Sequence, residues 1–290
     1  MSINPTDAAS GARRRTSRRI GEILRDFGRL HEEDISQVMA LQLKKGGRFG
    51  EVARRLGLIK EDDVQRALAH QFEYPYLPQG KVPVSPQLIA AYQPFSRHVE
   101  ALRALRSQLT LRWFNEARRT IAFTGSRSGV GCSSLTANLA IVFAQAGQRT
   151  LLIDANFRRP QQQDLFGMKC GGGLCGCLSG RGNFFDALSP VAPFEDLSVL
   201  SAGAVPPNPN ELLSQGSFVH VLETARANFD VVIIDTPAIT QYADAQMVAA
   251  RAGACILVTR RNQSRISEIE RAKDMIAPSG AALLGTVIND

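Results

Sequence analysis

The C-terminal two thirds of the chain alternates short, continuous apolar runs with stretches of helical spacing. Five runs have the length of buried strands, and they lie at residues 120–124, 149–154, 229–235, 254–259 and 282–290. Helical patterns occupy residues 96–113, 133–143 and 264–276. Continuous apolar runs indicate strands that are buried on both faces, as in parallel sheets. Because strands alternate with helices, the pattern predicts an α/β domain with a doubly wound, mostly parallel sheet over residues 96–290.

The N-terminal quarter is a tandem repeat without strand-like runs. RIGEILRDFGRLHEEDISQVMALQ (19–42) recurs as RFGEVARRLGLIKEDDVQRALAHQ (48–71) after the five-residue spacer LKKGG. Each copy has a glycine after its first helical stretch and an acidic cluster at the start of its second, which is typical of a helix pair joined by a turn. We therefore predict a small all-α tandem-repeat domain over residues 17–77. A disordered basic tail (1–16) precedes it and a proline-rich, extended linker (78–95) follows it.

Both copies match a known pattern, including the spacer. They resemble the N-terminal domain of those type II secretion and type IV pilus assembly ATPases that bind cyclic di-GMP. The resemblance implies a cyclic di-GMP site made of Arg19, Ile20, Gly21 and Gln42 from one copy and Arg48, Phe49, Gly50 and Gln71 from the other. Arginine can stack on guanine and donate to its acceptor edge, while glycine permits close backbone approach. The alternative is that these residues only tie the helices together and that the domain binds protein.

A glycine-rich loop follows the first apolar run and precedes a helical stretch. Its residues are Gly125, Ser126, Arg127, Ser128, Gly129, Val130, Gly131, Cys132, Ser133 and Ser134. Between a strand and a helix, successive backbone N–H groups converge on a phosphate. The usual pattern has lysine before the serine, but here the residue is Cys132. A thiol cannot supply that positive charge, and losing a fixed cation at the transferring phosphoryl group costs several kcal/mol. We predict an ATP-binding loop of doubtful affinity.

The second and third of the predicted strands each end in an aspartate. Asp154 ends the second run and Asp235 ends the third. The carboxyl ends of parallel strands meet at one edge of a sheet, where ligand sites form. Together with the hydroxyl of Ser133, these carboxylates are the oxygen ligands that Mg²⁺ prefers, so we predict a magnesium site there.

Residues 96–290 resemble the bacterial tyrosine autokinases of polysaccharide export, a branch of the P-loop ATPases that also holds the MinD and ParA proteins. The likeness is strongest to the EpsG-type kinases associated with chain-length determinants. It is carried by E-x-x-R-x-x-R (Glu100, Arg103, Arg106), LLIDA-x-x-R-x-P, AGAVPPNPNELL, IIDTP-A and a terminal V-I-N. Asn156 departs from the family pattern, which has a second acid there.

The resemblance to the autokinases implies a role for several residues. Asp154 would be a metal ligand or base, Asp235 a metal ligand and Asn289 an adenine contact. Glu100, Arg103 and Arg106 would join neighbouring subunits in a ring. Arg127 stands where MinD-like loops have an extra lysine, so it is a candidate catalytic cation in place of the missing one; ordinary solvent exposure is the alternative.

Charge and composition narrow the class of protein. The net charge of +7 divides into +3 for residues 1–80, +5 for 81–119 and −1 for 120–290. A solvated, flexible basic end is the favoured interpretation, so we do not expect nucleic acid as a partner. No apolar run approaches the ~18 residues of a membrane span, and five cysteines, an odd number, fit a reducing compartment better than a disulfide framework. We expect a cytoplasmic protein, held at the inner membrane through a partner.

The predicted function is regulation of exopolysaccharide biosynthesis and export. A tyrosine-kinase-like ATPase domain, with ATP and Mg²⁺ as cofactors and weak or lost kinase activity, would be coupled to a cyclic di-GMP sensor. The expected partners are further copies of the chain and a membrane chain-length determinant protein. Three alternatives stay open: an active tyrosine autokinase, a MinD/ParA-type positioning ATPase, and a secretion-system adaptor.

Overall fold

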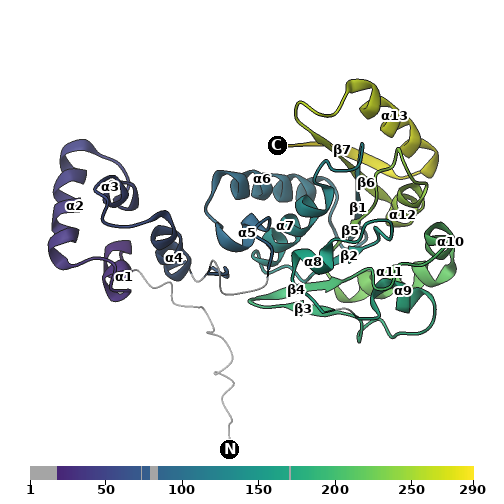
Figure 1. The fold of residues 1–290 in the computed structure, drawn as a ribbon, viewed down its shortest axis with the longest axis horizontal. Helices are drawn as coiled ribbons and strands as arrows, with labels where there is room; N and C mark the ends of the chain where they lie inside the picture. Colours follow the sequence, from purple (N-terminus) through teal and green to yellow (C-terminus); the bar gives the residue numbers. More distant parts are fainter. Residues whose placement is uncertain (1–17, 73, 79–83, 170) are drawn as a thin grey trace, which may run out of the picture. The chain divides into compact units, whose positions relative to one another are not determined.

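The chain divides into two compact units in the computed structural model, Met1–Tyr74 and Pro75–Asp290 (Figure 1). We call them the helical unit and the sheet unit. The structure describes residues 18–72, 74–78, 84–169 and 171–290, and the predicted basic tail lies outside them. Each unit has its own apolar core.

The described residues of the helical unit form four helices. They are α1 (Ile20–Asp26), α2 (Glu32–Lys45), α3 (Phe49–Arg55) and α4 (Glu61–Gln71). Gly28 follows α1 with φ +65° and Gly57 follows α3 with φ +73°, a left-handed conformation that glycine adopts at little cost. Helix α1 packs on α4, and α2 packs on α3. The same sequence signals therefore produce the same helix–turn–helix twice, 29 residues apart.

The described residues of the sheet unit form one sheet of seven strands. They are β1 (Thr120–Gly125), β2 (Thr150–Asp154), β3 (Ser189–Val191), β4 (Phe194–Leu200), β5 (Val231–Asp235), β6 (Ala254–Arg260) and β7 (Ala282–Asn289). Their order is β3-β4-β2-β5-β1-β6-β7. Only the edge pair β3–β4 is antiparallel, which agrees with the mostly parallel α/β sheet that we predicted. The β3–β4 pair was not foreseen, since its sequence lacks a continuous apolar run.

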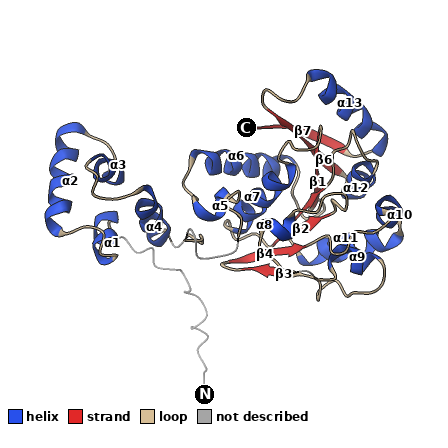
Figure 2. Ribbon diagram, in the orientation of Figure 1, coloured by secondary structure: helices blue, strands red, loops and turns tan. Residues whose placement is uncertain are grey.

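Helices cover both faces of this sheet (Figure 2). One face bears α5 (Ile89–Tyr92), α6 (Arg97–Arg112), α7 (Cys132–Ala144) and α8 (Gln162–Leu165). The other bears α9 (Gly173–Leu178), α10 (Pro209–Ser214), α11 (Gly216–Asn228), α12 (Asp244–Ala252) and α13 (Ile266–Ile276), which η1 (Ala277–Ser279) extends. Alternate residues of β1 and β5 enter the two cores, which explains why these strands read as continuous apolar runs.

Residues 79–83 of the linker that we predicted over 78–95 lie outside the described residues, and residues 84–95 are not extended but docked on the sheet unit. Helix α5 packs on α7, and Leu88, Ala90 and Ala91 are fully buried. The amide of Asn138 on α7 holds this segment, because its Oδ1 accepts from the Ala90 N–H at 2.8 Å and its Nδ2 donates to the Gln87 carbonyl at 2.9 Å. The small apolar residues between the prolines therefore belong to the core of the sheet unit.

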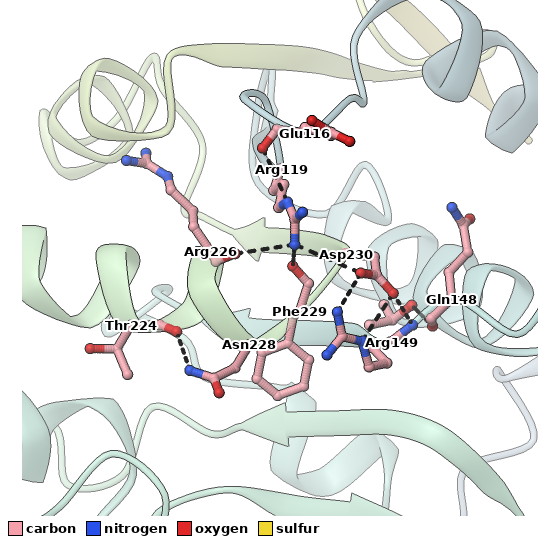
Figure 3. A network of polar contacts seen from close by, with 10 residues as sticks. Glu116, Arg119, Gln148, Arg149, Thr224, Arg226, Asn228, Phe229 and Asp230 are labelled. Atoms are coloured by element: carbon pink, nitrogen blue, oxygen red, sulfur yellow. Dashed lines mark hydrogen bonds and ion pairs between the residues drawn. The ribbon is translucent and has the colours of Figure 1, made fainter.

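An ion-pair network ties together the amino ends of the central strands (Figure 3). Arg149 donates to both carboxylate oxygens of Asp230, and Arg119 lies 3.7 Å from the same carboxylate. Arg119 also donates to the carbonyls of Arg226 and Phe229. The pKa of Asp230 is lowered, mainly by its hydrogen bond with Arg149. This network lies at the opposite ends of the strands from the glycine-rich loop.

Candidate functional site

The glycine-rich loop connects β1 to α7 at the carboxyl edge of the sheet. Gly129 and Gly131 have φ of +83° and +84°, which an L-residue rarely adopts. A Cβ on Gly131 would lie 2.2 Å from the Asn289 Nδ2, and one on Gly125 would lie 2.8 Å from the Arg127 carbonyl oxygen. The loop therefore has the tight turn and the bare backbone that a phosphate cradle requires.

A cavity of about 880 Å³ opens over this loop. Its lining comes from the loop itself, the turns after β2 and β5, the ends of β6 and β7, and α6 with the segment before it. Asn289, the expected adenine contact, lines it and donates from Nδ2 to the Val130 carbonyl at 3.0 Å. Asn289 thus lies beside the loop, at the end of β7.

Asp154 and Asp235 are direct neighbours in the register between β2 and β5, and both are fully buried. Burial raises the pKa of Asp154 to about 7, and the charge of Asp235 adds to the rise. Burial likewise raises the pKa of Asp235 to about 6. Two carboxylates on adjacent strands in a dry environment resist ionising together, so the pair is suited to receive a cation.

The two carboxylates are not equally available. Asp154 accepts three backbone N–H groups, from Asn156, Gln161 and Gln162, at 3.0 Å each. Its oxygens shape the turn after β2. Asp235 is less committed, because its Oδ1 has no hydrogen-bond partner among the residues that the structure describes. Asp235 is the better placed of the two to meet a ligand.

Cys132 begins α7 where a lysine would be expected, and only 9% of it is exposed. Burial raises the pKa of its thiol well above the usual value, and the neighbouring Asp235 adds to this. The group is a neutral thiol at physiological pH and supplies no positive charge to the loop.

Gln162 is a site residue that the sequence gave no reason to select. It begins α8, is fully buried, and donates from Nε2 to Asp235 Oδ2 at 2.9 Å and to the Ser133 carbonyl at 3.1 Å. Its Oε1 has no partner within the described ranges. No motif marks it, because its position depends on a turn that only the folded Asp154 creates.

Four arginines reach the cavity: Arg127, Arg158, Arg159 and Arg260. Arg127 donates to the Gln263 carbonyl at 3.3 Å. Arg158 makes a bidentate ion pair with the buried Asp244, at 2.8 and 3.3 Å, and lies over the ring of Tyr242. The cavity is therefore rich in positive charge although its loop has no lysine.

The residues present fit a nucleotide and Mg²⁺ in most respects. An open loop on a helix N-terminus accepts an anion, and the unpartnered Asp235 Oδ1 beside Ser133 supplies oxygen ligands that Mg²⁺ uses together with water and phosphate. No cluster of three His, Cys, Asp or Glu residues occurs in the described part of the chain. The ion would thus depend on the nucleotide for the rest of its ligands.

The three residues of E-x-x-R-x-x-R lie on α6, but the two arginines turn toward their own chain. Arg103 donates to the Pro94 carbonyl at 2.6 Å and to Glu100 at 3.1 Å. Arg106 donates to the Val142 carbonyl of α7 at 3.0 Å. Only Glu100 has a mostly exposed side chain, 73%.

In the helical unit, the predicted residues take equivalent places in the two copies. Arg19 and Arg48 are the N-caps of α1 and α3 and are exposed. Gln71 donates to the Arg18 carbonyl at 2.8 Å, and Gln42 donates to the Gly47 carbonyl at 2.9 Å. Each glutamine thus donates a hydrogen bond to the residue that precedes Arg19 or Arg48. Gly21 and Gly50 are buried beneath these turns, and Ile20 and Phe49 are half-buried.

The comparison with known proteins agrees with this geometry. The ParA family model, described as an NUBPL iron-transfer P-loop NTPase, matches residues 116–289. Tyrosine-protein kinase YwqD of Bacillus subtilis is 33% identical over 202 residues, which are 70% of this chain and 85% of YwqD. Tyrosine-protein kinase wzc of Salmonella typhi is 32% identical over 70% of this chain, which spans only 28% of wzc.

A solved structure supports the same assignment. The kinase domain of Escherichia coli tyrosine kinase ETK is 29% identical, with a TM-score of 0.68, covering 73% of this chain and 82% of that domain. The shared P-loop NTPase fold implies binding of ATP and Mg²⁺. In the described part of this chain, no helix is long and apolar enough to cross a bilayer. The chain belongs to the Wzc/CapB-like bacterial tyrosine kinases, within the ParA/MinD family of P-loop NTPases.

Proposed function

We propose that the chain regulates exopolysaccharide assembly, with a sheet unit that binds ATP and Mg²⁺ but has weak or lost tyrosine kinase activity. The buried, neutral thiol of Cys132 at the lysine position carries this proposal. Backbone N–H groups of the loop would hold the phosphates, and Ser133 with Asp235 would hold the metal. Bound Mg²⁺ would neutralise phosphate charge. Without the lysine, position 132 supplies no cation for the charge that develops in phosphoryl transfer.

Incubation of the whole chain with radiolabelled ATP tests this proposal. We expect little phosphotyrosine from the natural chain and at least a tenfold rise in Cys132→Lys, because restoring a cation recovers transition-state stabilisation. Asp235→Ala in the Cys132→Lys background should remove the gain. Strong phosphorylation by the natural chain that is lost in Asp235→Ala alone would contradict the proposal and favour the active autokinase.

Arg127 is proposed to compensate for part of the missing charge. If it does so, Arg127→Ala weakens ATP binding and slows hydrolysis. Its hydrogen bond to a neutral carbonyl leaves its charge unpaired by any acid among the described residues. If the affinity for ATP and the rate of its hydrolysis do not change in Arg127→Ala, Arg127 is an ordinary solvent-exposed arginine without a catalytic role.

The helical unit is proposed to bind cyclic di-GMP. The observation in favour is that two exposed arginines occupy equivalent N-cap positions. In each copy a glutamine side chain donates to the carbonyl of the residue before the arginine. Neither guanidinium forms an ion pair with another described residue. Two arginines at equivalent N-cap positions suit a ligand with two phosphates and two guanines.

Calorimetric titration of the whole chain with cyclic di-GMP tests the sensor. We expect binding that weakens about tenfold to hundredfold in Arg19→Ala plus Arg48→Ala, since each charge-assisted contact contributes ~1.5–3 kcal/mol. Arg55→Ala is the matched control, because Arg55 is an exposed arginine at the end of α3. Absence of heat in the natural chain would favour the alternative in which the repeat binds protein.

Assembly and location complete the proposal. By likeness to its relatives, the chain would form a homo-oligomer through Glu100, Arg103 and Arg106 and dock on a membrane chain-length determinant protein at the inner membrane. Nucleic acid is not a proposed partner. A MinD/ParA-type positioning ATPase is the second candidate, and Arg127 at the signature position is the observation that favours it.

A further inference from the structure

We propose that Arg159 and Arg260 supply the positive charge of the phosphate site that Cys132 cannot provide. This inference rests on the proposed binding of ATP. Both side chains line the cavity and contact the glycine-rich loop itself. The Arg159 Nη1 lies 3.5 Å from the Ser128 Oγ, and the Arg260 Nη1 lies 3.3 Å from the Gly129 carbonyl oxygen.

The two arginines approach the loop from opposite sides. Arg159 follows β2 and Arg260 ends β6, and in the sheet these strands lie on either side of the pair β5–β1. The loop leaves the end of β1, between them. A phosphate held by the loop backbone would thus have one guanidinium on each flank, which suits the several oxygens of a polyphosphate.

Arg159 is placed by the buried carboxylate below it. Asp154 fixes the turn on both sides of Arg159 by accepting from the N–H groups of Asn156 and Gln161, each at 3.0 Å. The Asn156 Oδ1 accepts from the Arg159 N–H at 3.1 Å. The backbone of Arg159 is therefore rigid, although its side chain is exposed. This gives Asp154 a positioning role besides the metal role predicted for it.

Arg260 is placed by the neighbouring strand and turn. It is paired in register with Asn289, and its N–H donates to the Ser264 Oγ at 3.0 Å. That hydroxyl lies 3.2 Å from the Ser126 Oγ of the loop. The backbone of Arg260 is thus connected, through the Ser264 hydroxyl, to the loop that its guanidinium contacts.

The charges of these two arginines are available, whereas that of Arg158 is not. Arg158 is committed to the buried Asp244. Within the described ranges, Arg159 and Arg260 form no ion pair, and their contacts with the loop are long and made to neutral acceptors. Exchanging such a contact for a phosphate oxygen gains a charge-assisted hydrogen bond of roughly twice the strength.

Binding of ATP, ADP and adenosine to the whole chain with magnesium tests the assignment. We expect Arg159→Ala and Arg260→Ala each to weaken ATP binding about tenfold or more, with a smaller effect on ADP and none on adenosine. Arg261→Ala is the matched control, because Arg261 is the next residue, pairs with Asp290 and does not line the cavity. Arg→Lys at either position should recover part of the affinity.

A double-mutant cycle with Cys132→Lys adds a second readout. If the arginines substitute for the lysine, Arg260→Ala costs less affinity in the Cys132→Lys background than in the natural chain. Unchanged ATP affinity in the double variant Arg159→Ala plus Arg260→Ala overturns this assignment alone. Failure of the natural chain to bind ATP or tripolyphosphate overturns it together with the proposed nucleotide binding.

Discussion

At the scale of single residues, Asp235 carries an unfavourable charge in the folded chain. Burial raises its pKa to about 6, whereas an unfolded aspartate titrates near 3.9. The folded state therefore binds more protons than the unfolded state between about pH 4 and pH 6, and the free energy of unfolding falls as pH rises through that window. A carboxyl group whose charged form is destabilised by burial is typical of a functional site. Here a bound cation would offset that cost.

We therefore expect Asp235→Asn to raise the thermal stability of the ligand-free chain at pH 8. The gain should be on the order of 1–3 kcal/mol, since each pKa unit corresponds to ~1.4 kcal/mol. It should shrink at pH 5, where the natural carboxyl is largely protonated. Thermal unfolding at both pH values measures it.

Asp230→Asn is the control of opposite sign. Its carboxylate is paired with Arg149 and its pKa is lowered, so this change should lower the melting temperature at pH 8. A drop of stability in Asp235→Asn at pH 8 would contradict the charge argument.

At the scale of elements, Asn138 of α7 makes two hydrogen bonds to the segment from Val84 to Tyr92, and Ser134 and Gln145 add one each. Asn138 satisfies the Ala90 N–H and the Gln87 carbonyl, and it donates to the Ser134 carbonyl at 2.8 Å as well. The Tyr92 hydroxyl donates to the Val84 carbonyl at 2.5 Å and closes the segment. Because Gln87 and Ile89 line the cavity, the docked segment forms one wall of the nucleotide site.

Asn138→Ala should destabilise the chain by about 2–3 kcal/mol, because it leaves the buried Ala90 N–H without an acceptor. Amide hydrogen exchange of residues 88–92 should accelerate more than that of the sheet. Ser134→Ala, which removes one exposed hydrogen bond to Gln87, is the matched control and should cost less than about 1 kcal/mol. Equal effects of the two changes would show that Asn138 does not hold the segment.

The sequence was sufficient for the central strands and for most of the cavity's framework, because apolar runs ending in Asp154 and Asp235 determine where the carboxyl edge lies. It was insufficient where a structure depends on tertiary contacts. The prolines of residues 78–95 indicated a connector, yet Leu88 and Ala91 supply enough apolar surface to dock on α7. Arg159 occupies an unspecified position of the LLIDA-x-x-R-x-P motif and Gln162 lies beyond it, so the motif selects neither residue.

At the scale of the whole molecule, substitutions of the α6 residues can distinguish an effect on assembly from an effect on folding. Arg106 satisfies a backbone carbonyl of α7, so its removal affects the fold whether or not copies associate. Glu100 is largely exposed, and it forms an ion pair with Arg103 on the same helix. An exposed i,i+3 pair contributes little to stability. A change at Glu100 would therefore report on the proposed assembly with little effect on folding.

We expect Glu100→Arg to lower the assembled fraction of the whole chain by at least tenfold at fixed concentration, since it places a like charge against arginines of a neighbouring copy. Its melting temperature should stay within about a degree or two of the natural chain. Arg106→Ala should lower both. Sedimentation velocity and thermal unfolding of the same samples separate the cases. If Glu100→Arg assembles like the natural chain, the motif acts within one subunit, where the Arg106 hydrogen bond holds α6 on α7.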